Sequence, residues 1–211
     1  MVITGVHYHD QGSLKEAEEM YQRALAGREK ALGPDHISTL HTVHNLGELY
    51  SDQNMLQKAE KMHQRALAGY EKSLGPDDIS TLDFAHNLAV IYCKQGKLEK
   101  AEAMFKRVLS GKKKAFGPSC PSVLAVINNL GNLYEQQERL GKAEEMYQYT
   151  LDGWLETFGL ENPSTLGVMN NLGILYQAQG RVKKAEEMYQ QALAGYEKWL
   201  AWMVYPHLTL F

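Results

Sequence analysis

The sequence lacks most of the features that mark secreted, membrane-spanning or nucleic-acid-binding proteins. Its 211 residues include only two cysteines, Cys93 and Cys120, whose unrelated positions fit neither a disulfide framework nor a metal-ligand pattern. The formal net charge of −3 favours neither nucleic acid nor an anionic membrane. No segment approaches the roughly 18 consecutive apolar residues that span a bilayer, and no signal peptide is visible. These absences favour a cytoplasmic protein with reduced thiols.

The sequence does contain a long internal repeat. Ala17 recurs as Ala59, Ala101, Ala143 and Ala185, in steps of 42 residues. A leucine or valine lies three residues before each alanine, and a glutamate lies one residue after it. A fixed period of this length is typical of stacked units that cannot bury their apolar faces alone. We place the units at about 1–37, 38–79, 80–121, 122–163 and 164–200, with an apolar tail at 201–211.

Each unit is predicted to contain two helices. In the unit 38–79, apolar residues recur at helical spacing over residues 40–50 and again from about 56 to 74. Between these segments, Asn54 can adopt the left-handed conformation that ends a helix, whereas the equivalent Glu138 should do so at some cost. Gly75 and Pro76 end the second helix. Ser38 and Thr39 are expected to cap the first helix.

A small residue recurs inside the first helix of each unit. These residues are Gly47, Ala89, Gly131 and Gly173. Because glycine within a helix costs about 1 kcal/mol relative to alanine, its recurrence requires a reason. We predict close antiparallel packing of the two helices, with each small residue against the recurrent alanine of the partner helix.

The residues around these positions resemble a known repeat family. Leu46-Gly47-x-x-Tyr50 followed by Ala59 is similar to the tetratricopeptide repeat, and the pattern recurs in the later units. The aromatic residue expected four positions after the alanine is replaced once, by His63. The unit is longer than the usual ~34 residues. It resembles the variety found in kinesin light chains and in repeat arrays of fungal and bacterial nucleotide-binding signalling proteins.

The resemblance implies an all-α fold. We expect a right-handed superhelix, an α-solenoid of antiparallel helix pairs with about four and a half repeats. Its first helices would line a concave groove that holds an extended peptide or a partner helix. The resemblance implies no cofactor and no catalysis, so the favoured function is a protein–protein interaction scaffold. A kinesin-light-chain-like adaptor and the recognition domain of a receptor are equally compatible settings.

The candidate groove residues lie on the first helices, on the side away from the predicted core. They are His41, His44, Asn45, Glu48, Asp83, His86, Asn87, Val90, Asn128, Asn129, Asn132, Asn170, Asn171 and Ile174. The recurring asparagines carry most of the argument, because an amide offers two donors and an acceptor to a peptide backbone. In related arrays, the asparagine before the Leu-Gly pair contacts bound peptide. The alternative is that these amides join neighbouring repeats.

The histidines support a rival hypothesis, an enzyme or a metal-binding protein. His41 and His44 are three residues apart, and Asp83 and His86 occupy the equivalent positions in the next unit. Facing helices could bring them together as metal ligands or as an acid–base pair. However, such helices lie about 10 Å apart, and no known metal signature accompanies them. We therefore favour a polar, pH-sensitive groove wall without a metal.

Both ends of the repeat pattern are irregular. Thr4-Gly5-x-x-Tyr8 aligns with the middle of a first helix, and the register is lost after Leu200. Because solenoids need polar caps, we expect a piece of a longer array or a truncated product. Its uncapped ends and apolar tail would support formation of a homo-oligomer. The basic run at 112–114 is interpreted as a solvated helix end.

Overall fold

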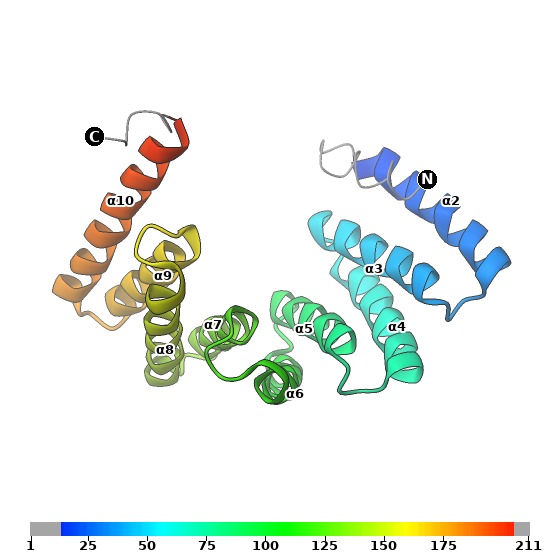
Figure 1. The fold of residues 1–211 in the computed structure, drawn as a ribbon, viewed down its shortest axis with the longest axis horizontal. Helices are drawn as coiled ribbons and strands as arrows, with labels where there is room; N and C mark the ends of the chain where they lie inside the picture. Colours follow the sequence, from blue (N-terminus) through cyan, green and yellow to red (C-terminus); the bar gives the residue numbers. More distant parts are fainter. Residues whose placement is uncertain (1–13, 205–211) are drawn as a thin grey trace. The chain divides into compact units, whose positions relative to one another are not determined.

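The computed structural model describes residues 14–204, which form α-helices joined by short turns and contain no strand (Figure 1). The first helices of the repeats are α3 (Ile37–Asp52), α5 (Ile79–Lys94), α7 (Pro121–Gln136) and α9 (Pro163–Ala178). The second helices are α2 (Leu14–Leu32), α4 (Leu56–Leu74), α6 (Leu98–Phe116), α8 (Leu140–Phe158) and α10 (Val182–Val204). Equivalent helices begin 42 residues apart, so the predicted all-α repeat fold is confirmed.

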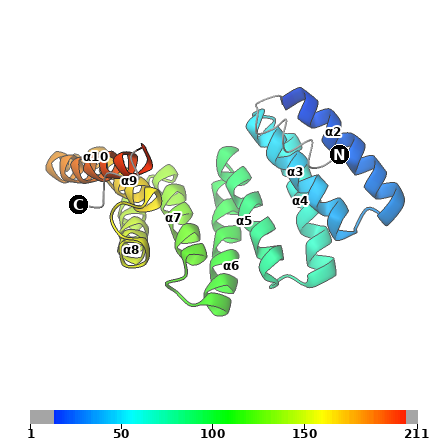
Figure 2. The same cartoon turned by 45° about the horizontal axis from the view of Figure 1, so that its top comes forward.

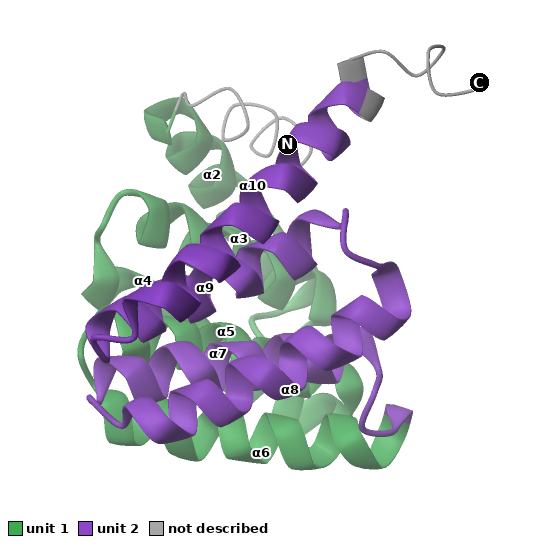
Figure 3. Ribbon diagram, turned by 90° about the vertical axis from the view of Figure 1, so that its left-hand side faces the viewer, with its two compact units in different colours: residues 1–115 green, residues 116–211 purple. Residues whose placement is uncertain are grey.

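The chain divides into two compact units, residues 1–115 and 116–211 (Figure 3). In the first unit, α3 packs against α2 and α4, and α4 packs against α5. In the second, α8 packs against α7 and α9, and α9 packs against α10. The paired helices run antiparallel within each unit (Figure 2). Of the predicted tail at 201–211, residues 201–204 continue α10, and the remainder lies outside the described residues.

The turns within the helix pairs adopt the predicted left-handed conformation. The φ angle is 57° at Asn54 and 58° at Glu138, and it is 72° at both Gly96 and Gly180. Glycine adopts this conformation freely, whereas other L-residues pay about 1–2 kcal/mol. Glu138 is therefore the least favourable residue at this position.

The caps of the first helices differ from the prediction. Ser38 and Thr39 lie inside the first turn of α3, and the Nδ1 atom of His36 accepts a hydrogen bond from the Ser38 amide at 3.1 Å. Asp78 caps α5 in the same way, with its Oδ1 atom 2.8 Å from the Ser80 amide. The prediction was wrong because α3 begins two residues earlier than a cap at Ser38 requires, so the amide of Ser38 itself needs a partner and finds it in the side chain of His36.

The small residues of the first helices do allow close packing, but not against the alanines. A Cβ atom at Gly131 would lie 2.6 Å from Cε1 of Tyr147, and one at Gly173 would lie 2.5 Å from Cε1 of Tyr189. At Gly47 the neighbour is the ring of His63, 3.0 Å from such a Cβ. The partner is therefore the residue four positions after the alanine. Its ring can lie this close to the backbone because glycine has no side chain there.

The two helices of each repeat make a second close contact, in which the positions of the glycine and the large side chain are exchanged between the helices. Here the glycine lies on the second helix and a buried leucine lies on the first. A Cβ atom at Gly69 would meet Leu40 at 2.5 Å, and one at Gly153 would meet Leu124 at 2.7 Å. Gly111 and Gly195 face the equivalent leucines. These glycines recur every 42 residues, a signal that the sequence analysis overlooked.

Ion pairs join second helices of successive repeats within each unit. Arg65 of α4 pairs with Glu29 of α2, and Arg107 of α6 pairs with Glu71 of α4 at 2.6 Å. In the second unit, Arg181, the residue directly before α10, pairs with Glu144 of α8 at 2.6 Å. All of these side chains are about a third exposed, so each pair contributes on the order of 0–1 kcal/mol.

Replacing Gly131 with leucine tests the first contact. The new side chain must displace the fully buried ring of Tyr147, so we expect Gly131→Leu to lower the free energy of unfolding by about 1–3 kcal/mol. Gly141→Leu on α8 is the control, because a Cβ atom there meets nothing within 4 Å. Urea titration followed by circular dichroism measures both. Equal stability of the two variants would contradict the assignment.

Candidate functional site

The first unit contains a cavity of about 320 Å³ between α3 and α5. Its walls combine four predicted groove residues with three residues that were not predicted. The lining residues are His41, His44, Tyr70, Ser80, Asp83, Phe84 and Asn87. Four side chains of this cavity thus belong to the set that the sequence predicts on one side of two successive first helices.

The residues missed by the sequence analysis give the cavity an aromatic wall. The rings of Tyr70 and Phe84 are stacked, with centroids 4.0 Å apart and planes inclined at 28°. His41 approaches Tyr70 edge-on at 5.8 Å, and His44 approaches Phe84 edge-on at 4.9 Å. The hydroxyl of Tyr70 is buried without a hydrogen-bond partner. These four rings form a surface suited to an apolar or aromatic side chain.

Phe84 could have been found in the sequence by its departure from the repeat. The equivalent positions in the other first helices carry Thr42, Val126 and Val168. A large ring at a position that otherwise holds a smaller side chain reaches into space that its counterparts leave open. Tyr70 gave no such signal, because an apolar or aromatic residue was expected at its position in the core.

Asp83, on the polar edge of the cavity, forms an ion pair with Lys112. The Nζ atom of Lys112 lies 2.6 Å from Oδ1 of Asp83, and only 9% of the lysine side chain is exposed. The interpretation of residues 112–114 as a solvated helix end was therefore wrong for Lys112. Its position on α6 lets the apolar stem lie along α5 while the ammonium group reaches Asp83. The pair leaves little net charge beside the cavity.

Burial keeps the inner imidazoles neutral. It lowers the pKa of His44 to about 4, with a further contribution from His41. Burial also lowers the pKa of His86 to about 4; nearby Lys112 lowers it further, and Asp83 opposes this shift. These two groups therefore change charge near pH 4, well below the unperturbed histidine pKa of about 6.5.

The second unit places its candidate residues in a more polar setting. Asn171 of α9 donates to Oδ1 of Asn132 on α7 at 3.4 Å, and the same oxygen accepts from the Tyr147 hydroxyl at 2.6 Å. Asn132 and Asn171 therefore join neighbouring repeats, the alternative that the sequence left open. The remaining candidates are exposed or half-buried: Asn170 and Ile174 are exposed, whereas Asn45, Glu48, His86, Val90, Asn128 and Asn129 are half-buried.

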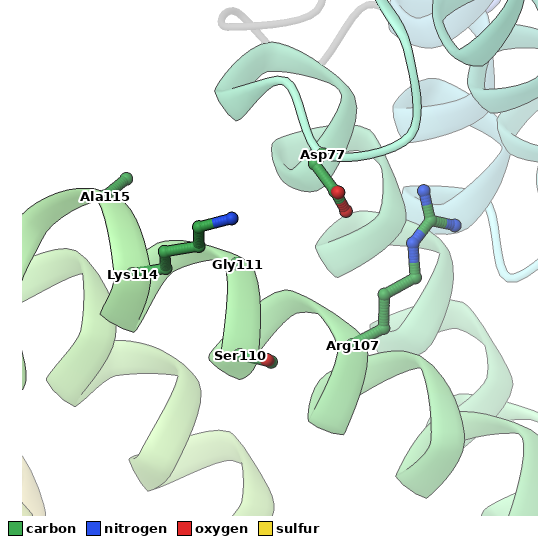
Figure 4. Close-up of a pocket in the computed structure, with 6 residues that line it drawn as sticks. All are labelled: Asp77, Arg107, Ser110, Gly111, Lys114 and Ala115. Atoms are coloured by element: carbon green, nitrogen blue, oxygen red, sulfur yellow. The ribbon is translucent and has the colours of Figure 1, made fainter.

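The first unit also holds a larger cavity of about 540 Å³, between α6 and the turn that precedes α5 (Figure 4). Asp77, Arg107 and Lys114 project around it. The guanidinium of Arg107 already donates to Glu71 and to the Pro76 carbonyl, at 2.6 and 2.7 Å. This cavity has no aromatic wall and contains none of the predicted residues. The smaller cavity is therefore the better candidate site.

The metal-binding arrangement considered from sequence is not the one that forms. Within residues 14–204, the group with ligand atoms close enough to share an ion is His44, Glu48 and His63. It includes neither Asp83 nor His86. His63 was treated in the sequence only as an exception to the repeat pattern, although the equivalent Tyr21, Phe105 and Tyr147 are buried as it is.

The comparisons with known proteins define the family to which this fold belongs. A tetratricopeptide repeat model matches residues 5–72, 57–114, 80–153 and 122–198, so the chain belongs to the tetratricopeptide repeat family. No curated protein gives a significant sequence match. Among the helices of residues 14–204, none has the length and apolar character needed to cross a membrane.

Solved structures narrow the resemblance within the family. The chain is similar to the nearly identical, kinesin-light-chain-like TPR repeats of a Podosopora anserina protein. That match has 26% identity and a TM-score of 0.79, and it covers 93% of each chain. BtubC from P. vanneervenii shares 22% identity, with a TM-score of 0.69 over 89% of this chain and 72% of that one. A Rap protein complexed with competence and sporulation factor shares the fold at 16% identity and a TM-score of 0.76, over 94% of this chain and 54% of that one.

Acid should destabilise the first unit partly through His86. Because the pKa of His86 is about 4 in the folded protein and about 6.5 when unfolded, the unfolded state gains the proton first as pH falls. Stability is therefore lost between about pH 6.5 and 4, by up to about 3 kcal/mol. The variant His86→Asn has the asparagine found at the equivalent positions 128 and 170, and its free energy of unfolding should fall less with acid. Urea titrations of both proteins at pH 7 and pH 4.5, with chelator present, measure the difference. Equal losses would contradict this role.

Proposed function

We propose that this chain is a protein-interaction module that binds an extended peptide or a partner helix on the exposed side of its first helices. Membership of the tetratricopeptide repeat family supports interaction rather than catalysis. The observation that carries the proposal is the aromatic cavity of the first unit, which includes four residues expected to face a ligand.

The chemistry of the cavity indicates what kind of segment would bind. The rings of Tyr70 and Phe84 favour an apolar or aromatic side chain as the anchor. The amide of Asn87 and the hydroxyl of Ser80 can hydrogen-bond to the backbone beside that anchor. Because Lys112 neutralises Asp83, the cavity has little preference for a strongly charged peptide. A short segment with one large apolar residue among polar neighbours fits this combination.

The similar structures support the proposed setting. The protein with 26% identity has kinesin-light-chain-like repeats, which favours an adaptor role over the receptor alternative for this chain. The Rap protein was solved with a bound competence and sporulation factor, so this fold accommodates a ligand in that protein. A cytoplasmic adaptor that recognises short segments of its partners is the function we infer.

A random peptide library displayed on phage tests this function while the natural partner is unidentified. Peptides selected on the parent chain should carry a large apolar residue and should bind through the cavity. The variant Phe84→Thr has at this position the threonine that the preceding repeat has at position 42. We expect it to bind the selected peptides at least ~10-fold more weakly, the equivalent of about 1.4 kcal/mol. Fluorescence polarisation with labelled peptides measures the affinity.

A matched variant controls for effects away from the cavity. Gln57→Ala combined with Lys61→Ala changes two exposed side chains of α4 that do not line the cavity. This double variant should bind the selected peptides as the parent does, and circular dichroism should show equal helicity in all three proteins. Unchanged binding by Phe84→Thr would place the recognition surface elsewhere.

Self-association is a separate proposal that concerns α10. Leu193, Leu200 and Met203 are 60%, 48% and 53% exposed, an unusual number of large apolar side chains for one helix of a monomer. A second copy is the occupant that we propose for them. Leu193→Glu should reduce the mass measured by light scattering at high protein concentration. The same mass for parent and variant would exclude this contact.

A further inference from the structure

The residue that departs from the repeat pattern at position 63 has an unusual environment. The equivalent positions carry an aromatic residue each time: Tyr21, Phe105, Tyr147 and Tyr189. His63 is fully buried, and neither of its ring nitrogens forms a hydrogen bond, although Nε2 lies near the Glu48 carboxylate. Buried polar atoms in native proteins are almost always paired, so two unpaired nitrogens on one ring require an explanation.

Two potential ligands lie beside this imidazole. His44 and Glu48 are four residues apart on α3 and therefore project from the same face, one turn apart. The Nε2 atom of His63 lies 3.3 Å from Oε1 of Glu48, and the rings of His44 and His63 are 5.2 Å apart. One ligand atom from each of the three residues lies within 4.8 Å of the other two. The missing side chain of Gly47 lets the His63 ring approach α3 so closely.

We propose that His44, Glu48 and His63 bind one divalent transition-metal ion, with Zn²⁺ as the ion that best fits this ligand set. Two histidines and a glutamate form a recognised zinc-binding combination, and water can complete the coordination. Separations of up to 4.8 Å would have to shorten, because zinc–ligand bonds of about 2.0–2.2 Å bring tetrahedral ligand atoms closer together. Rotation of the Glu48 side chain, which is 44% exposed, can shorten only its own separations, so the His44 ring must rotate as well to approach His63.

The surroundings favour entry of an ion and also contain one opposing charge. Because Glu48 is partly exposed, water and ions can reach the site from its side. His44 has a buried Nδ1 atom without a partner, so this ring too has a nitrogen available as a ligand. Lys94 is the opposing cation, and its ammonium group donates to Ser51 Oγ at 2.7 Å. A bound ion would satisfy buried nitrogens and would fix the His44 ring, which also lines the aromatic cavity.

The repeat itself supplies a variant that removes one ligand. His63→Tyr places at this position the residue found at three of the four equivalent ones. The structure already accommodates a tyrosine ring over a glycine at this contact, as Tyr147 over Gly131. The variant should therefore fold while losing the metal site. His86→Asn is the matched control, since His86 is a half-buried imidazole outside the three-residue group.

Isothermal titration of the chelator-treated full chain with Zn²⁺ tests the proposal, and titration with Co²⁺ adds a visible spectrum that reports nitrogen and oxygen ligation. We expect one ion per parent chain. The Zn²⁺ affinity of His63→Tyr should fall by at least the roughly 10–100-fold that follows mutation of a residue that hydrogen-bonds to a metal ligand. Glu48→Gln should weaken binding less, because an amide oxygen remains, and His86→Asn should bind as the parent does.

The outcomes distinguish a specific metal site from weak, non-specific binding. The chain has eight histidines, so weak binding at exposed rings should survive in every variant. Equal affinity and stoichiometry for the parent and His63→Tyr would overturn the proposal, as would the lack of a one-to-one complex in the parent. If His63→Tyr does not fold, His44→Asn replaces it, because asparagine occupies the equivalent positions 128 and 170. Peptide binding is measured separately, so failure here would leave the proposed interaction function intact.

Discussion

The close approach of the two helices in each repeat is the constraint on which the rest of the structure depends. It requires a residue without a bulky side chain at two places, once on each helix. At Gly131 the ring of Tyr147 covers the backbone, and at Gly153 the side chain of Leu124 does so. Each contact places a large apolar group against main chain, which gives dense packing over a small area. Glycine inside a helix is unfavourable by about 1 kcal/mol, so this packing must offset that loss in every repeat.

Much of the fold could be predicted because the repeat presents the same evidence several times. The 42-residue period, the Gly75-Pro76 stop and the left-handed Asn54 each recur in related form and define the helix boundaries closely. What could not be predicted were contacts that depend on side-chain direction. The glycine at position 131 was assigned to the correct interface, but its partner was misidentified, because spacing places a residue on a face without giving the reach of the ring opposite.

The candidate site was less accessible to sequence reasoning for the same physical reason. The repeat pattern identifies the residues that all repeats have in common. The candidate site depends instead on residues that occur in one repeat only. Phe84 and His63 both differ from the residues at the equivalent positions of the other repeats. Each acquires its role from neighbours on another helix. Burial determines the rest. It keeps His86 neutral far below the usual histidine pKa and hides most of Lys112 against α5, and neither effect is encoded in the local pattern.

The ion pairs between second helices have a consequence for how the array unfolds. The apolar contacts within a repeat are largely buried, whereas Arg65–Glu29, Arg107–Glu71 and Arg181–Glu144 are partly exposed. Dissolved salt screens exposed pairs far more than it affects buried apolar packing. In a linear array, the interaction between neighbours determines whether repeats unfold together or one at a time. High ionic strength therefore removes only on the order of 0–1 kcal/mol of this coupling per pair, whereas buried side chains shared by successive repeats, such as Leu49, Ala59 and Ile91, still hold the neighbours together.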